Sequence, residues 1–98
     1  MELDHDVQAL LDAMRALQFR LEGIDDFWAN NVRIASDEVS RSDAHGLSRF
    51  LSFFGGMGSL DDLVLQRSGR VLGAENDQLD ELRLRAWQLA DGLKRELE

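Results

Sequence analysis

The 98-residue sequence contains no cysteine, no proline and no tyrosine. Without cysteine the chain forms no disulfide and offers no thiolate for catalysis or for zinc. Long apolar runs are also missing, and the first residues, MELDHDVQ, are acidic and polar where a secretion signal is basic and then apolar. We therefore expect no contact with a membrane and a cytoplasmic location.

Basic residues are scarce. The chain has 19 acidic and 11 basic residues and a net charge of −8. A nucleic-acid-binding protein needs a basic face to neutralise phosphates, so we expect no nucleic-acid partner. An acidic surface attracts a basic protein partner by electrostatic steering, and it also serves solubility alone.

The length and composition are those of one folded domain spanning residues 1–98, with 44% hydrophobic and 31% charged residues. Apolar residues recur at spacings of three and four, which predicts an all-α fold. We expect a small bundle of three to four main helices, with the first and last packed antiparallel to the second and the third closing one end. The expected helices cover residues 3–21, 25–39, 43–54 and about 75–95, with Gly23 ending the first and Asp43 capping the third.

The stretch from Phe53 to Leu63, FFGGMGSLDDL, concentrates glycine beside aromatic residues. A phosphate-binding loop of the Walker type would need a lysine after the glycines, and none is present. Glycine readily adopts the left-handed conformation that ends helices, and serine followed by acids begins them. We therefore predict a structural corner made of Gly55, Gly56, Gly58 and Ser59, followed by one short helix capped by Ser59.

The segment Gln66–Gly73, QRSGRVLG, is ambiguous. Two short apolar stretches flank a Ser-Gly pair and could form a small hairpin or an irregular loop. An isolated two-stranded hairpin is marginally stable, so we favour the loop.

Few residues in the sequence suggest a catalytic or metal-binding role. His5 lies between Asp4 and Asp6, but neighbours on a helix point in different directions and cannot bind one metal ion together. We expect no metal site, no cofactor and no catalytic residues. The competing class is an enzyme or small-ligand-binding protein that uses the Gly55–Asp62 corner, with His45 as a further polar group.

Six residues are candidates for contact with a protein partner: Trp28, Phe53, Met57, Asp61, Asp62 and Trp87. Large aromatic residues belong in the core, or anchor an interface when they are exposed. Asp62 can bind the backbone N–H groups of the corner or contact a partner.

The block Asp43–Leu65, DAHGLSRFLSFFGGMGSLDDLVL, resembles the signature of a small bacterial family of helical proteins with no assigned function. Trp28, Gly46, Leu47 and Phe54 also match that pattern, which commonly has Asn where this chain has Asp61. The resemblance implies an all-helical protein and supplies no reaction. Some small acidic proteins of this kind accompany secreted toxins as immunity partners.

From these observations we expect a non-enzymatic protein-interaction module, with an immunity-type inhibitor of a basic toxin or enzyme as its most concrete form. A homodimer built on the apolar stripes of the first and last helices is a further alternative.

Overall fold

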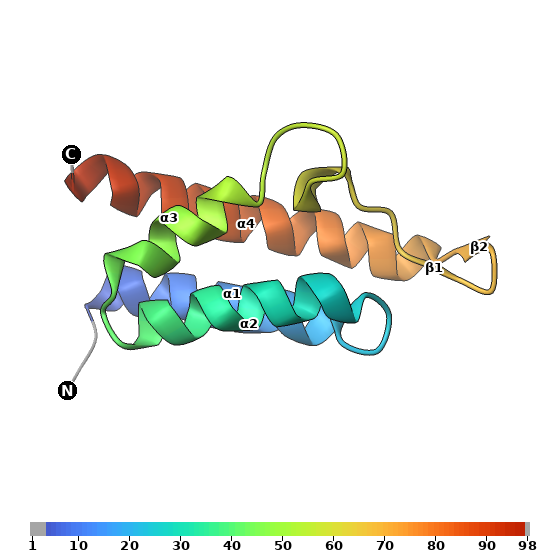
Figure 1. Ribbon diagram of the computed structural model, residues 1–98, viewed down its shortest axis with the longest axis horizontal. Coiled ribbons are helices and arrows are strands. Elements are labelled where there is room, and N and C mark those ends of the chain that lie inside the picture. Colours follow the sequence, from blue (N-terminus) through green and yellow to red (C-terminus); the bar gives the residue numbers. More distant parts are fainter. Residues whose placement is uncertain (1–3, 98) are drawn as a thin grey trace.

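The computed structural model describes residues 4–97, so Leu3, which we placed at the start of the first apolar stripe, lies outside the described residues. The fold is a small, mostly helical bundle, as expected (Figure 1). Its elements in chain order are α1 (His5–Leu21), α2 (Asp26–Ser40), α3 (Ala44–Ser52), the 3-10 helix η1 (Leu60–Asp62), β1 (Gln66–Arg67), β2 (Arg70–Val71) and α4 (Gly73–Leu97).

The helices begin where short polar side chains can cap them. The Oδ1 atoms of Asp4, Asp25 and Asp43 accept backbone N–H groups at the starts of α1, α2 and α3, at 2.9, 3.1 and 2.9 Å. Each bond satisfies a donor that the helix itself leaves unpaired. The capping role expected of Asp43 is therefore confirmed, and Asp25 is the cap of α2.

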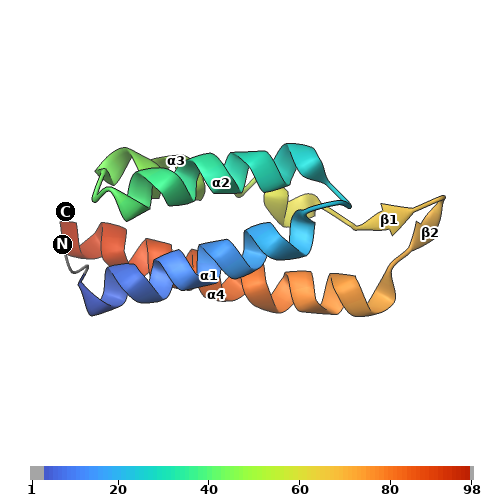
Figure 2. The ribbon, with the colours of Figure 1, turned by 90° about the horizontal axis from the view of Figure 1, so that it is seen from below.

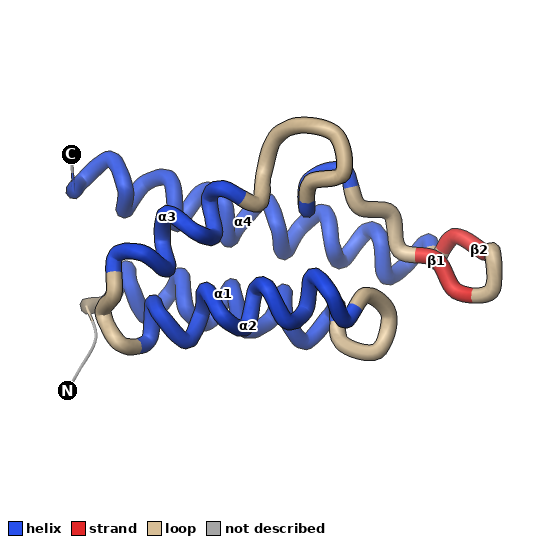
Figure 3. The backbone as a smooth tube through the Cα atoms, viewed as in Figure 1, coloured by secondary structure: helices blue, strands red, loops and turns tan. Residues whose placement is uncertain are grey.

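The directions of the long helices differ in part from the expectation. α1 runs antiparallel to α2 and to α4, so α2 and α4 run in the same direction (Figure 2). The predicted antiparallel packing of the last helix against the second is therefore wrong. α3 packs against both α2 and α4 and covers the side between them, rather than closing an end (Figures 1 and 3).

The core consists mainly of the predicted stripes. The fully buried large side chains are Phe50, Leu10, Met14, Leu17, Leu21, Leu60, Leu65, Leu79 and Val32. Burying a side chain of this size contributes about 1.5–3 kcal/mol to folding. The stripes of α1 and α4, which we considered as a dimer interface, lie largely inside this core. Phe19 and Phe27 lie outside it, with 75% and 70% of their surface exposed.

The segment after η1 forms a hairpin, so the preference for a loop was wrong. Gln66 pairs with Val71 and Arg67 with Arg70 in antiparallel register, and the hairpin projects from one end of the bundle (Figure 2). Ser68 and Gly69 have φ angles of 54° and 79°, which suits a two-residue turn with positive φ at both positions.

Asn76 of α4 joins this hairpin to the bundle. Its Oδ1 accepts the N–H of Leu65 at 2.7 Å, and its Nδ2 donates to the carbonyls of Leu65 at 3.0 Å and Leu72 at 2.7 Å. These bonds pair the backbone on both sides of the strands. The hairpin is therefore not isolated, which is why the argument from marginal stability failed.

Candidate partner-binding site

The glycine corner lies between α3 and η1. Gly55, Gly56 and Gly58 have φ angles of 89°, 87° and 76°. A Cβ atom on any of the three would meet nothing within 4 Å, so the backbone conformation, and not a lack of space, favours glycine here. The N–H of Leu60 donates to the carbonyl of Phe53 at 2.8 Å and closes the corner into a compact loop.

The helix that follows the corner differs from the prediction. Ser59 makes no capping bond, and its buried hydroxyl has no partner. The short helix is only the three-residue turn η1, in which the N–H of Asp62 donates to the carbonyl of Ser59 at 3.1 Å. Backbone carbonyls of Phe53 and Ser59 thus accept the N–H groups of Leu60 and Asp62 in place of a side-chain cap.

Asp62 turns back to the corner. Its Oδ2 accepts the N–H of Gly58 at 3.4 Å, the first of the two roles that we considered for this residue. The contact places a carboxylate where an anion bound to the corner would lie. A phosphate at this position would therefore be repelled.

Arg83 of α4 holds the corner in place, and the sequence reasoning missed it. Its Nη1 donates to the carbonyls of Leu60 and Leu63, both at 3.0 Å, and its Nη2 donates to Asp80. The side chain is only 15% exposed. The one signal in the sequence was an acid three residues before an arginine, which occurs on many exposed helices.

A groove runs between the corner and α4. Its volume is about 610 Å³, and it is lined by Leu51 and Phe54 from the end of α3, by Gly55 and Asp61 from the corner, and by Asp80, Arg83, Leu84 and Trp87 from α4. Leu84 is 56% exposed and Trp87 is 36% exposed. The groove therefore presents apolar surface to solvent beside the carboxylate of Asp61, which has no ion pair within residues 4–97.

The other aromatic candidates lie together in a second cluster. Trp28 of α2 contacts Phe53 edge to face, with ring centroids 5.4 Å apart, and Phe53 contacts Phe50 at 6.0 Å. Phe50 also contacts Phe54 at 5.3 Å, and Phe54 lines the groove. This chain of rings joins α2, α3 and the corner, and it leaves Trp28 and Phe53 half-buried.

Met57 stands at the tip of the corner with 99% of its surface exposed. Of the six candidate residues, the structure thus brings Asp61 and Trp87 to one groove and Trp28 to Phe53. Asp62 is bound to the corner backbone.

The polar groups of the enzyme alternative are not gathered at one place. His45 lies in the first turn of α3, where its ring Nδ1 is 3.1 Å from Asp43 Oδ1. The corner follows the opposite end of that helix, so a helix rise of about 12 Å separates His45 from the corner. Within residues 4–97 no group of three or more His, Asp or Glu residues is arranged to hold a metal ion. None of the described helices combines the length and the apolar character needed to cross a bilayer.

The fold and the groove define a small helical protein with a glycine-rich corner fixed to its last helix. The model of one family, described as Domain of unknown function (DUF6966), matches residues 22–73. That range is more than half of the chain, so the chain belongs to this family; it covers α2, α3, the corner and the hairpin. A search of curated proteins and a search of solved structures found no match.

Proposed function

We propose that this chain is a non-enzymatic protein-interaction module that binds a basic partner at the groove between the glycine corner and α4. The observation that carries the proposal is the pair of exposed apolar side chains, Leu84 and Trp87, that line this groove together with Asp61. An exposed tryptophan beside other apolar side chains is a frequent anchor of protein interfaces. Exposed patches of this kind on a small protein mark interaction sites.

The charge distribution supports a basic partner. The chain carries a net charge of −8, and within the groove Asp80 offsets the charge of Arg83. Asp61 therefore leaves the groove with a net negative charge. A basic protein would be steered to this surface, and an apolar side chain of that protein would find Trp87 and Leu84.

Met57 is a second candidate for contact with the partner. A thioether side chain at the tip of a loop adapts its shape to a partner at low cost, because it is flexible and polarizable. Met57 is more exposed than any other large apolar residue described. We therefore expect a partner that enters the groove to contact this residue as well.

An immunity-type inhibitor is the most concrete form of this function. The small size, the acidic charge and the implied bacterial source of the Asp43–Leu65 block all fit a protein that neutralises a basic toxin or enzyme in the cytoplasm. Tight inhibition of this kind depends on a few anchoring aromatic residues and on charge complementarity.

The test is affinity capture from the native lysate with the purified chain, at low and at high salt. We expect one basic protein at one-to-one stoichiometry, identified by mass spectrometry and then purified. Trp87→Ala should weaken its binding at least tenfold, since anchor residues contribute about 2 kcal/mol or more. Asp61→Asn should weaken binding mainly at low salt.

Phe19→Ala is the matched control, because Phe19 is an exposed aromatic residue on α1 that does not line the groove. It should bind the partner as the wild type does. A captured protein that binds Trp87→Ala and the wild type equally would refute this placement of the interface. Absence of any stoichiometric partner at low salt would refute the proposed function.

A small-ligand-binding protein is the second candidate, because the space beside Gly55 is hollow and carries the polar groups of Asp61, Asp80 and Arg83. In that case Trp87 fluorescence should change on addition of a low-molecular-weight fraction of the lysate. A protein partner that binds without such a fraction would favour the first candidate.

A further inference from the structure

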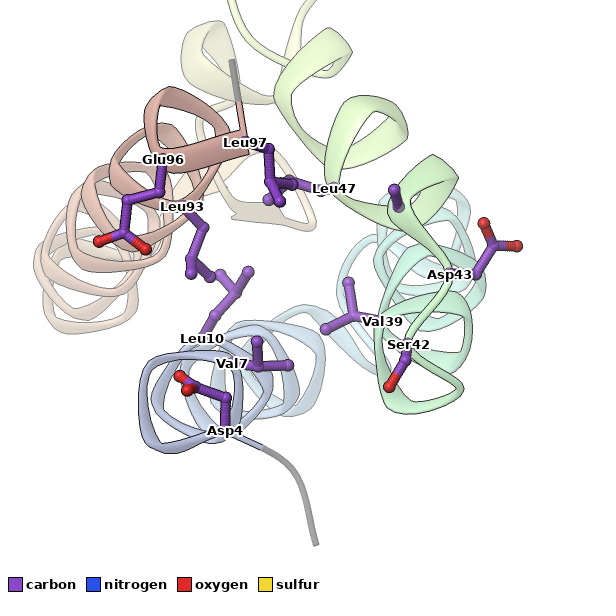
Figure 4. A pocket seen from close by; sticks show the side chains of 11 residues that line it. Asp4, Val7, Leu10, Val39, Ser42, Asp43, Leu47, Leu93, Glu96 and Leu97 are labelled. Atoms are coloured by element: carbon purple, nitrogen blue, oxygen red, sulfur yellow. The ribbon is translucent and has the colours of Figure 1, made fainter. Parts of the chain in front are cut away.

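A second hollow lies at the end of the bundle where α1 begins and α4 ends (Figure 4). Its volume is about 310 Å³, which is at the lower limit for small-molecule pockets. Four segments meet there: the start of α1, the end of α2, the start of α3 and the end of α4. It shares no lining residue with the groove at the glycine corner.

The inside of this hollow is apolar. Val7, Val39 and Leu93 point toward its centre, and the buried Leu10 and Leu47 form its deeper wall (Figure 4). Leu97, which is 70% exposed, stands at its mouth. Among the described lining residues the one hydroxyl is that of Ser42, and it points away from the centre in Figure 4, so the part of a ligand that enters must be a hydrocarbon.

The mouth of the hollow is acidic. The acidic residues Asp4, Asp43 and Glu96 line it, and among residues 4–97 no lysine, arginine or histidine does. In Figure 4 the carboxylate of Asp43 points away from the hollow, and it accepts the backbone N–H of His45 at 2.9 Å. The exposed acids Asp4 and Glu96 therefore remain to act on a head group at the mouth. An anionic head group, as in a fatty acid, would be repelled there, and a cationic one attracted.

We propose that this pocket binds a small aliphatic amine, with the hydrocarbon chain between Val7, Val39 and Leu93 and the ammonium group at the acidic mouth. The pocket closes around the chain on several sides, and the exposed acids Asp4 and Glu96 supply the charge preference. This site is independent of the partner-binding groove.

The test is a titration of the full chain followed by NMR, with three probes of equal length: hexylammonium, hexanol and hexanoate. We expect chemical-shift changes centred on Val7, Val39, Leu47 and Leu93. At low salt hexylammonium should bind about tenfold more tightly than hexanoate, with hexanol between them. The difference should shrink as salt is added.

Two variants locate the site. Val7→Phe fills the hollow from a half-buried position and should weaken binding of all three probes at least tenfold. Glu96→Gln should weaken hexylammonium binding about twofold and leave hexanol binding unchanged. Glu81→Gln, an exposed acid on the same helix that does not line the pocket, should change neither.

Should Val7→Phe lower the stability of the fold, Val7→Ile is the milder filling variant and should give a smaller loss in the same direction. Equal binding of hexylammonium and hexanoate at low salt would overturn the proposal. So would shift changes that lie elsewhere, or binding that both filling variants leave intact.

Discussion

Gly46 of α3 lies so close to α2 that a Cβ atom added to it would be 2.7 Å from the carbonyl oxygen of Ala35. The same atom would lie 2.7 Å from Glu38 Cβ and 2.8 Å from the backbone N of Val39. Two of these neighbours are backbone atoms of a helix and cannot move alone. The close approach of α2 and α3 therefore depends on glycine at this position.

We predict that Gly46→Ala lowers the free energy of unfolding by about 1–3 kcal/mol, because the added methyl group forces the two helices apart. Urea denaturation measures the change. Gly92→Ala is the control, since Gly92 is an exposed glycine inside α4 with nothing within 4 Å of an added Cβ. That substitution should raise stability by about 0.5–1 kcal/mol, and a loss of similar size in both variants would contradict the steric argument.

Asn76→Ala should loosen the hairpin. The substitution removes three hydrogen bonds to Leu65 and Leu72 and leaves backbone groups of these residues without their partner. We expect a loss of about 1–3 kcal/mol and faster hydrogen exchange at Leu65. Asp77→Ala, at the exposed neighbouring position, should leave exchange at Leu65 as it is in the wild type.

Arg83→Ala should release the glycine corner from α4. The carbonyls of Leu60 and Leu63 would lose a charged donor, at a cost of about 1–3 kcal/mol. The NMR signals of residues 55–63 should broaden or shift, whereas Arg85→Ala, at an exposed position on the same helix, should leave them unchanged. Loss of stability without any effect on the corner would show that Arg83 does not hold it.

The lowered pKa of Asp43 predicts that the stability of the fold depends on pH. The backbone N–H of His45 donates to its carboxylate at 2.9 Å and, with the nearby charges of His45 and Arg41, holds its pKa below the ordinary value of 3.8. A carboxyl whose pKa is lower in the folded state contributes stability above its unfolded pKa, and this stability is lost as the pH falls through the folded pKa.

Asp43→Asn should therefore make the melting temperature less sensitive to acid between about pH 5 and about pH 2, while asparagine still caps α3. Asp77→Asn is the control and should show the acid sensitivity of the wild type. Parallel pH profiles for the wild type and Asp43→Asn would contradict the role of this charge.

The sequence predicted the helices well, because each carries a local signal. Leu10, Met14 and Leu17 recur at helical spacing, and all three are fully buried. Asp43 was recognisable as a cap since a cap needs only a short acceptor next to a helix. The glycine corner was also predictable, as clustered glycines favour positive φ angles.

The candidate site was harder to predict from the sequence. Trp87 and Asp61 were both chosen from the sequence, but their position on one groove depends on how η1 packs against α4. No local sequence pattern marks Arg83 or Asn76 as structural residues, because their partners lie far along the chain. Asn76 bonds to Leu65, eleven residues away, and Arg83 bonds to Leu60, 23 residues away. The hairpin was misjudged for the same reason.

The sequence by itself thus determined the helical elements, the corner between them and the acidic charge, all of which follow from neighbouring residues. Only the tertiary structure decided that α2 and α4 run in the same direction, that Phe27 is exposed, and that one groove and one terminal pocket remain open. These features depend on contacts between distant segments, where the packing of side chains and paired backbone groups selects one arrangement from several that the local pattern allows.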